Sequence, residues 1–218
     1  MDIYWGGQAL AKIKGKNASV IIDPFDPDYT GLKLPKDLVA NVCLITHSHS
    51  DHNNAKVVVD AGNSSVMAFD KPGEYEIAGA VVTGIASFHD EKEGAERGIN
   101  TIFHIMLDGM NLVHLGDFGQ SSLSEDQLAL IGPVDILFVP VGGVYTIDGK
   151  RASAIVAQIE PKIIVPIHYK IEGLKFELEG VEVFLKEMGV EGAVPLPKLP
   201  VNKDKLPEEP QVVVLSKS

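Results

Sequence analysis

Cysteine is nearly absent from this 218-residue sequence, which contains only Cys43. A single cysteine excludes a disulfide within the chain, so a reducing compartment is the simpler environment. Long apolar runs are also missing, because no stretch approaches the roughly 20 apolar residues that a membrane-spanning helix needs. The segment from Met1 to Gly7 lacks the basic residues and apolar stretch of a secretory signal. These absences predict a cytoplasmic protein that does not associate with membranes.

Basic side chains are outnumbered by acidic ones. The chain has 19 Lys and Arg against 30 Asp and Glu, a formal net charge of −11 and a pI near 5.0. This balance disfavours a large contact with a phosphate backbone, so we expect a small-molecule substrate and no nucleic-acid partner. The hydrophobic content of 45% and charged content of 22% are ordinary for a globular protein, and the length predicts one domain, residues 1–218.

Short apolar runs separated by Gly, Pro, Asn and Asp predict a chain rich in β-strands. Proline in Asp23-Pro24-Phe25-Asp26-Pro27 cannot donate to a sheet, so a loop is expected from there to about Pro35. After two strands joined by a hairpin near the start, strands are expected at 39–46, 66–69, 73–77, 80–85, 101–107, 111–115, 135–141, 162–167 and 211–215, and helices at 54–61, 124–131, 151–159 and 181–188, with a connector at 194–210.

The segment His47-Ser48-His49-Ser50-Asp51-His52 concentrates metal-ligating residue types at the end of an apolar run. In an extended chain His47 and His49 leave the same face, so two imidazoles can converge on one ion. Asp51 and His52 follow where the strand must turn, and adjacent residues on a turn point in different directions. They are therefore available to a second ion. A polar loop with chance histidines would need four such residues at useful spacing without a purpose.

Four other ligand-type side chains end predicted strands: Asp23, His89, Asp117 and His168. In layered proteins of helices and strands, ligands collect at the carboxyl ends of the strands, so these side chains are expected to meet at one rim. A two-zinc site needs histidines for affinity, carboxylates to lower the net charge, and an open position for water. The residue types predict such a site.

Two further histidines are interpreted as structural. His104 lies within a predicted strand among Ile102, Ile105 and Met106, which favours packing on a sheet face. His114 is three residues before Asp117 on the same strand, and this odd offset places the two on opposite faces. Neither is expected to bind metal.

These residues together resemble the metallo-β-lactamase fold superfamily. The resemblance is carried by His47-x-His49-x-Asp51-His52, His89, Gly116-Asp117 and His168, and covers about residues 1–169. Trp5, Ile22-Asp23-Pro24 and Phe88-His89-Asp90 are similar to the branch of small metal-dependent hydrolases that includes ascorbate-6-phosphate lactonase-like proteins. This resemblance implies an α/β fold, a four-layer αββα sandwich with the metals at one edge.

The resemblance also implies roles for the residues. His47, His49 and His89 would hold one zinc ion, and Asp51, His52 and His168 the other. Asp117 would bridge them, and Asp23 would orient a ligand histidine from outside the coordination sphere, as metal sites usually require. The chain departs from the pattern at Gly7-Gln8-Ala9, where relatives of this branch often carry a His-Ser pair.

The charge of such a site indicates its chemistry. Two Zn²⁺ ions give +4, Asp51 and Asp117 subtract two, and a bridging hydroxide subtracts one, which leaves about +1 and favours an anionic substrate. Zinc lowers the pKa of bound water to about 7, so a metal-activated hydroxide is available at neutral pH. We expect two Zn²⁺ per chain, with Mn²⁺ or Fe²⁺ as alternatives, and catalytic roles for Asp51, as proton acceptor, and Asp117. The reaction class is hydrolysis of an ester, lactone, amide or phosphoester.

Substrate contacts are expected on two loops at the same rim. Arg97 follows His89 in a charged, glycine-containing loop and can clamp a carboxylate or phosphate, with Asn100 beside it. Tyr145 follows the Gly142-Gly143 turn at the end of another strand. The alternatives are a solvated loop around Arg97 and a turn chosen for glycine geometry around Tyr145.

Three other functions fit parts of the pattern. A nuclease is the principal alternative, since the superfamily includes enzymes that cleave RNA and DNA, but the acidic balance and the lack of a basic arm disfavour it. A di-iron protein that handles oxygen or nitric oxide has similar ligands, but related enzymes carry a flavin domain for which this chain has no room. A non-catalytic scaffold gives no reason for a complete ligand set.

Overall fold

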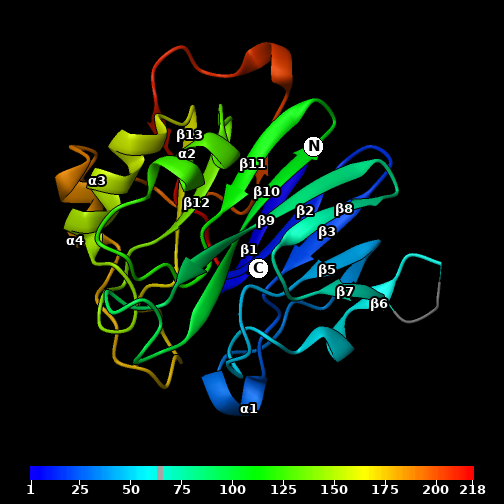
Figure 1. The fold of residues 1–218 in the computed structure, drawn as a ribbon, viewed down its shortest axis with the longest axis horizontal. Helices are drawn as coiled ribbons and strands as arrows, with labels where there is room; N and C mark the ends of the chain where they lie inside the picture. Colours follow the sequence, from blue (N-terminus) through cyan, green and yellow to red (C-terminus); the bar gives the residue numbers. More distant parts are fainter. Residues whose placement is uncertain (63–65) are drawn as a thin grey trace.

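The computed structural model describes residues 1–62 and 66–218. Most strands fall into two large sheets (Figure 1). The 6-stranded sheet has the order β14-β1-β2-β3-β5-β7, and the 7-stranded sheet has the order β15-β13-β12-β11-β10-β9-β8. The strands of the first sheet are β1 Asp2–Gly7, β2 Leu10–Lys14, β3 Ser19–Ile22, β5 Val42–Leu44, β7 Met67–Phe69 and β14 Leu199–Pro200.

The 7-stranded sheet combines an antiparallel half with a parallel half. Its strands are β8 Gly73–Ile77, β9 Ala80–Phe88, β10 Ile99–Leu107, β11 Met110–His114, β12 Ile136–Pro140, β13 Ile163–Ile167 and β15 Gln211–Val212. Strand β10 is antiparallel to both β9 and β11, whereas β11, β12, β13 and β15 run parallel. Strands β9, β11, β12 and β13 therefore point the same way, and their carboxyl ends lie at one edge.

Successive side chains along the central strands of the first sheet point to opposite faces, and the two faces belong to two different apolar clusters. Val20 and Ile22 of β3 join the main core, between the sheets, while Ile21 faces the other way into a second cluster. The same alternation places Val42 and Leu44 of β5 in the main core and Cys43 in the second cluster. Each of these strands is therefore apolar on both faces, as expected of a strand with other parts of the protein packed on both faces of its sheet.

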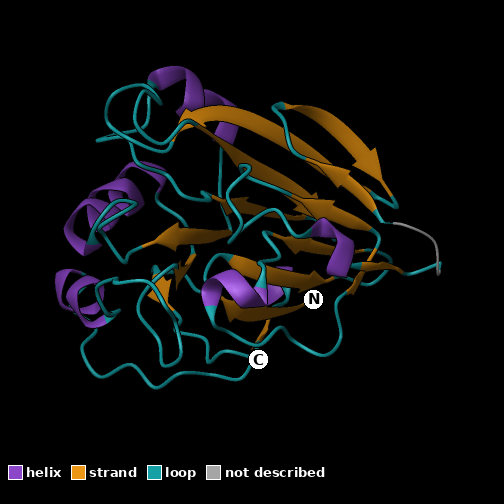
Figure 2. Cartoon of the chain, turned by 90° about the horizontal axis from the view of Figure 1, so that it is seen from below, coloured by secondary structure: helices purple, strands orange, loops and turns teal. Residues whose placement is uncertain are grey.

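The helices cover the two sheets unequally. Helices α2 Glu125–Ile131, α3 Gly149–Ile159 and α4 Glu182–Glu187 contribute Ile131, Ile155 and Phe184 to the main core and gather beside the 7-stranded sheet (Figure 1). Over the 6-stranded sheet, the second cluster is closed by loop residues such as Phe25, Leu38 and Leu178. The regular structure here includes helix α1 Pro27–Thr30, the 3-10 turn η1 Ala55–Val57 and strand β4 Val39–Ala40, whose Ala40 belongs to the cluster. In Figure 2, helices lie on the left beside the strands, and short helical segments are drawn in front of the strands near the centre.

This architecture is the expected αββα sandwich, with one outer layer built largely of loops. A helix with Ser124 at its start was expected from the Ser124 and Gln127 spacing, and α2 begins there with both bonds of a capping box in place. In the part of the chain that the structure describes, no helix is long and apolar enough to cross a membrane.

Several sequence-based element boundaries were wrong. The helix expected at 54–61 is only the short turn η1, because the residues after it form strand β6 Val59–Asp60, which pairs with β4 Val39–Ala40. The single strand expected at 39–46 is divided into β4 and β5 at Asn41, whose side chain accepts a hydrogen bond from Ser19 N. The connector expected at 194–210 contains β14 and a second 3-10 turn, η2 Lys203–Lys205.

Helix α1 was missed in the loop expected from Asp23 to Pro35. Its start carried a readable signal, since Asp26 caps the helix by accepting a hydrogen bond from Asp28 N, and Pro27 occupies the first turn. At four residues the helix is too short to show an apolar period, which is why the pattern did not reveal it.

Candidate metal centre

The ligand-type residues meet at one edge of the sandwich, just beyond the ends of strands from both sheets. Strands β3 and β5 of the first sheet lead to Asp23 and to the loop that begins at Ile45. From the second sheet, β9, β11 and β13 lead to His89, Asp117 and His168. A bond from Thr101 N to Thr46 O, of 2.8 Å, ties the two sheets together beside the site.

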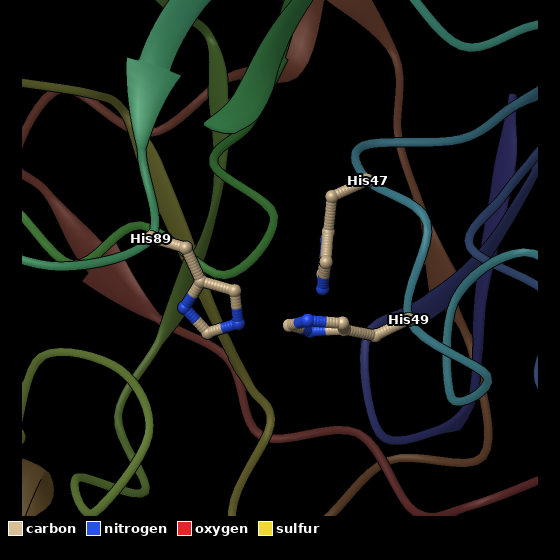
Figure 3. A group of neighbouring side chains, drawn as sticks. All are labelled: His47, His49 and His89. Carbon is tan, nitrogen blue, oxygen red and sulfur yellow. The ribbon is translucent and has the colours of Figure 1, made fainter. Parts of the chain in front are cut away.

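Three histidines from two segments point toward one another (Figure 3). The ring centroid of His47 lies 4.7 Å from that of His49 and 4.8 Å from that of His89. The centroids of His49 and His89 are 5.1 Å apart. One ligand atom from each ring lies within 4.8 Å of the others. The spacing therefore suits three imidazoles sharing one ion.

A second group lies beside the first and contains two carboxylates. Asp51, His52, Asp117 and His168 are all buried, and one ligand atom of each falls within 4.8 Å of the rest. The two groups correspond to the two ligand sets that the family resemblance implies, with Asp117 counted in the second.

One oxygen of Asp117 connects the groups. Asp117 Oδ2 lies 3.2 Å from Nε2 of His89 and 3.8 Å from Nε2 of His47, on the side of the three histidines. It also lies 3.2 Å from Nε2 of His52 and 3.3 Å from Nε2 of His168. A carboxylate in this position can contribute to both groups at once.

Unpartnered polar atoms test whether a cation fits. Among the described residues, buried His47 Nε2, His52 Nε2 and Asp117 Oδ1 have no hydrogen-bond partner. Buried polar atoms without partners are rare because each costs about 1 to 3 kcal/mol. These atoms belong to two imidazoles and a carboxylate, the donor types that zinc and related divalent metals prefer. The residues fit a metal centre.

Protonation states of the cluster also favour a cation. Burial and the positive charge of His52 lower the pKa of His47 to about 2, so its ring is neutral and able to ligate at physiological pH. Burial raises the pKa of Asp117, but the neighbouring imidazoles of His168 and His52 outweigh this effect and hold the pKa well below its usual value. Asp51 behaves similarly: burial opposes ionisation, and His52 nevertheless lowers its pKa. The carboxylates are therefore ionised.

Asp23 supports the cluster from behind. Its Oδ2 lies 2.9 Å from Nδ1 of His52, which leaves His52 Nε2 facing the site. The carboxylate is held in turn by Thr46, whose backbone N–H and hydroxyl donate to its two oxygens at 2.8 and 2.7 Å. Asp23 thus orients His52 through the far ring nitrogen, and Thr46 orients Asp23.

Asn100 lies beneath the site, which differs from the substrate contact expected for it. Its side chain is 1% exposed and donates 2.8 Å hydrogen bonds to Leu115 O and Ser87 Oγ. Its Oδ1 accepts from Asp117 N at 3.1 Å. Since this amide is fully used inside the protein, its place is to hold the backbone of Asp117. Gly116 permits the close approach, because an added Cβ would lie 2.5 Å from Asn100 Oδ1.

The two histidines interpreted as structural lie outside both groups. His114 is fully buried, with Nε2 2.9 Å from Ala9 O and Nδ1 accepting from Gly116 N at 3.1 Å. His104 is half-buried and lies 3.3 Å from Asn111 Oδ1.

A pocket of about 250 Å³ opens onto the ligands, and its wall includes Arg97 and Tyr145. The guanidinium of Arg97 lies 5.9 Å from the centroid of the Tyr145 ring and donates to Val144 O at 3.3 Å. Two further aromatic residues line the pocket: Tyr29 of α1, and Phe176, whose ring centroid is 5.1 Å from that of Tyr29. Sequence reasoning missed both, since neither belongs to a pattern of ligands or periodic apolar positions.

The loop that carries Arg97 is organised by Asp90. The Asp90 side chain is 3% exposed and accepts four backbone hydrogen bonds, from Lys92 and Gly94 at Oδ1 and from Glu96 and Arg97 at Oδ2. Arg151 closes the loop from α3 through an ion pair with Glu91. The available signal was an aspartate two residues after a strand, a residue type that commonly caps backbone turns.

Comparisons with known proteins agree with this geometry. Residues 2–168 match the family model of the beta-lactamase superfamily domain. A UPF0173 protein from Pyrococcus abyssi is 30% identical over 210 residues, which cover 85% of this chain and 94% of that protein. A UPF0173 metal-dependent hydrolase from Staphylococcus carnosus is 32% identical over 200 residues, with coverage of 78% and 85%.

A solved structure is also similar over nearly the whole chain. It is a candidate zinc-dependent hydrolase of the metallo-β-lactamase superfamily from Thermotoga maritima, with a TM-score of 0.79 and 32% sequence identity. The superposition covers 98% of this chain and 97% of that chain. Both sheets and the metal-facing edge therefore lie within the shared structure.

Proposed function

The chain belongs to the metallo-β-lactamase superfamily, and we propose that it is a metal-dependent hydrolase that holds two metal ions, zinc in the first place. The proposed substrate is a small anionic ester, lactone, amide or phosphoester. The observation that carries this proposal is the position of Asp117 Oδ2, within 3.3 Å of Nε2 of His89 and of His168, one from each ligand group.

The proposed ligands divide as the two groups do. His47, His49 and His89 would hold one ion, Asp51, His52 and His168 would hold the other, and Asp117 would contact both. Ions bound there would act as Lewis acids and lower the pKa of water to about 7. Mn²⁺ and Fe²⁺ suit the same mixture of nitrogen and oxygen donors and are the alternatives to zinc.

Asp51 is the proposed proton acceptor. It lines the pocket, and its Oδ2 lies 3.8 Å from Nε2 of His168, so its carboxylate is placed where it can take the proton that an attacking water loses. Asp117 is ionised as well, but it lies at the centre of the cluster and is surrounded by imidazoles. Its role is to hold charge in the site.

Arg97 is proposed to bind the anionic group of the substrate, since it brings a positive charge to the pocket wall. Tyr29, Tyr145 and Phe176 make the rest of the mouth aromatic, which suits an apolar portion next to that group. A pocket of about 250 Å³ holds only a small molecule, near the lower limit of typical ligand sites.

This mouth and the net charge of −11 support a small-molecule substrate over the nuclease alternative. We propose in the same sense that the protein acts in the cytoplasm, without a nucleic-acid or membrane partner. The experiment is a hydrolysis screen with lactone, thioester, phosphodiester, β-lactam and RNA substrates, using protein reconstituted with Zn²⁺, Mn²⁺ or Fe²⁺. Metal-dependent cleavage of a small anionic substrate is expected. Cleavage of RNA alone, with salt-sensitive binding, would establish the alternative.

A further inference from the structure

Gln8 reaches into the second ligand group from the end of β1, and nothing in the proposed reaction uses it. The residue is 0% exposed and has a left-handed backbone, with φ of +48°. Its backbone carbonyl accepts hydrogen bonds from Trp5 Nε1 at 2.7 Å and from His168 N at 3.0 Å. Gln8 is thus fixed against the end of β13, where His168 also has a positive φ of +51°.

The side chain of Gln8 engages two ligand atoms of the same group. Its Nε2 donates to Asp51 Oδ2 at 3.1 Å and lies 3.3 Å from His168 Nε2. The same Asp51 oxygen lies 3.4 Å from His52 Nε2, and the same His168 nitrogen lies 3.3 Å from Asp117 Oδ2. An amide nitrogen carries two hydrogens and has no lone pair to offer a cation, so it can satisfy both atoms but cannot ligate a metal.

The other end of the amide supports this orientation. Gln8 Oε1 is buried and has no hydrogen-bond partner among the described residues. Exchanging the two ends would place an amide oxygen 3.1 Å from the ionised Asp51 oxygen, a contact between two acceptors. The nitrogen therefore faces the ligand group, and the side chain leaves its own oxygen unsatisfied in order to reach Asp51 and His168.

We propose that Gln8 competes with the metal ion of the second group and makes that position the weaker of the two. The inference rests on the proposed two-metal function. An ion bound through His168 Nε2 must take the single lone pair of that nitrogen, which the Gln8 amide now engages, and an ion at Asp51 Oδ2 must share that oxygen with the same amide. Among the described residues, no side-chain amide contacts a ring nitrogen of His47, His49 or His89, and the one hydroxyl contact, from Thr46 Oγ1 at 3.0 Å, is to His47 Nδ1 and not to the Nε2 that faces Asp117. The two positions then fill in order, the three-histidine position first.

The test is a calorimetric titration of metal-free protein with Zn²⁺, together with metal analysis after gel filtration. Two variants remove the competing hydrogens. Gln8→Gly deletes the side chain and suits the positive φ, and Gln8→Glu is nearly isosteric and replaces the donor with a carboxylate. Glu160→Gly is the matched control, because Glu160 has a similar φ of +51° at the end of α3 and lies outside the ligand groups.

Wild type is expected to bind the second Zn²⁺ at least tenfold more weakly than the first. Both Gln8 variants are expected to tighten the second step by about tenfold, the scale of one net hydrogen bond, and to leave the first step unchanged. Glu160→Gly should behave as wild type. Thermal unfolding of the metal-free proteins shows whether each variant is folded. If the cavity left by Gln8→Gly unfolds the protein, the titration is carried out on Gln8→Glu.

The outcomes separate this inference from the proposed function. Two ions that bind wild type and both variants with the same affinities would overturn only the competition by Gln8. A second step that weakens in Gln8→Gly and in Gln8→Glu would also overturn it and would assign Gln8 a positioning role. If neither wild type nor any variant binds a second ion, the two-metal proposal fails, and the inference fails with it.

Discussion

Asp23 and His52 are 29 positions apart in sequence and form a buried pair, with Asp23 Oδ2 2.9 Å from His52 Nδ1. The pair determines which ring nitrogen of His52 is free. Because Nδ1 is directed at the carboxylate, Nε2 faces Asp117 at 3.2 Å. A proposed metal ligand is thereby oriented by a residue that follows strand β3.

Asp23→Asn should weaken metal binding by about 10- to 100-fold while the protein remains folded, because loss of such a partner releases the ring orientation of the ligand. The measurement is the Zn²⁺ affinity by competition with a chelator. Thr46→Val removes the hydroxyl bond to Asp23 and also the 3.0 Å contact of that hydroxyl with His47 Nδ1, so it should weaken metal binding in the same direction. Unchanged affinity in Asp23→Asn would show that Asp23 does not orient His52.

His49→Ala should abolish metal retention at the three-histidine position and hydrolysis together, since His49 is one of three rings that converge there. His104→Ala is the control, because His104 lies outside both ligand groups and makes only a 3.3 Å contact with Asn111. Metal content by mass spectrometry and hydrolytic rate are measured on the same preparations. Equal losses in the two variants would overturn the ligand assignment.

Arg97→Ala should raise KM for an anionic substrate by about tenfold and change kcat little, because a charged hydrogen bond to the substrate is lost while the ligand cluster is intact. An uncharged analogue of the same substrate supplies the control and should show no change in KM. A KM for the anionic substrate equal to that of wild type would remove Arg97 from the binding site.

Asp90→Ala should loosen the loop that presents Arg97, since four backbone N–H groups lose their common acceptor. We expect faster amide hydrogen exchange at residues 92–97 and a higher KM. Burial raises the pKa of Asp90, but these backbone bonds lower it below its usual value. Its stabilising effect is therefore present at neutral pH and is lost as pH falls below about 4, through the lowered pKa. Exchange that does not differ between Asp90→Ala and wild type would contradict this role.

Ser124→Ala should destabilise the protein by about 1 kcal/mol. The change removes the hydrogen bond that the Ser124 side chain accepts from Gln127 N in the capping box of α2. Chemical denaturation measures the change, and metal affinity should be unaffected because no residue of α2 belongs to a ligand group or lines the pocket. A free energy of unfolding equal to that of wild type would show that the cap contributes nothing.

Local sequence rules predicted the parts of the structure that depend on neighbours in the chain. Ser124 and Gln127 mark the start of α2 by a spacing of three residues, and the strand 73–77 is bounded by glycine-containing turns. The helix expected at 54–61 was wrong because the pairing of Val59 with Val39 in a sheet overrode the local helical preference of this segment. Long-range pairing of this kind leaves no mark on a window of a few residues.

The ligand types were readable for the same reason, since His and Asp at strand ends form a pattern within single segments. The residues that surround these ligands could not be predicted from the sequence. Asn100 was expected to face the substrate, but its position under Asp117 is set by contacts with Leu115 and Ser87 on neighbouring strands. Phe176 reaches the pocket from a loop without any ligand or period, so only the folded chain places it there.

Anomalous X-ray diffraction at the zinc edge, from crystals of the Zn²⁺-reconstituted protein, tests directly whether the cluster binds two metal ions. Two peaks are expected, one among His47, His49 and His89 and one among Asp51, His52 and His168, with the Asp117 carboxylate between them. Data from metal-free crystals supply the baseline. No peak at this edge of the sandwich, or a single peak outside both ligand groups, would contradict it.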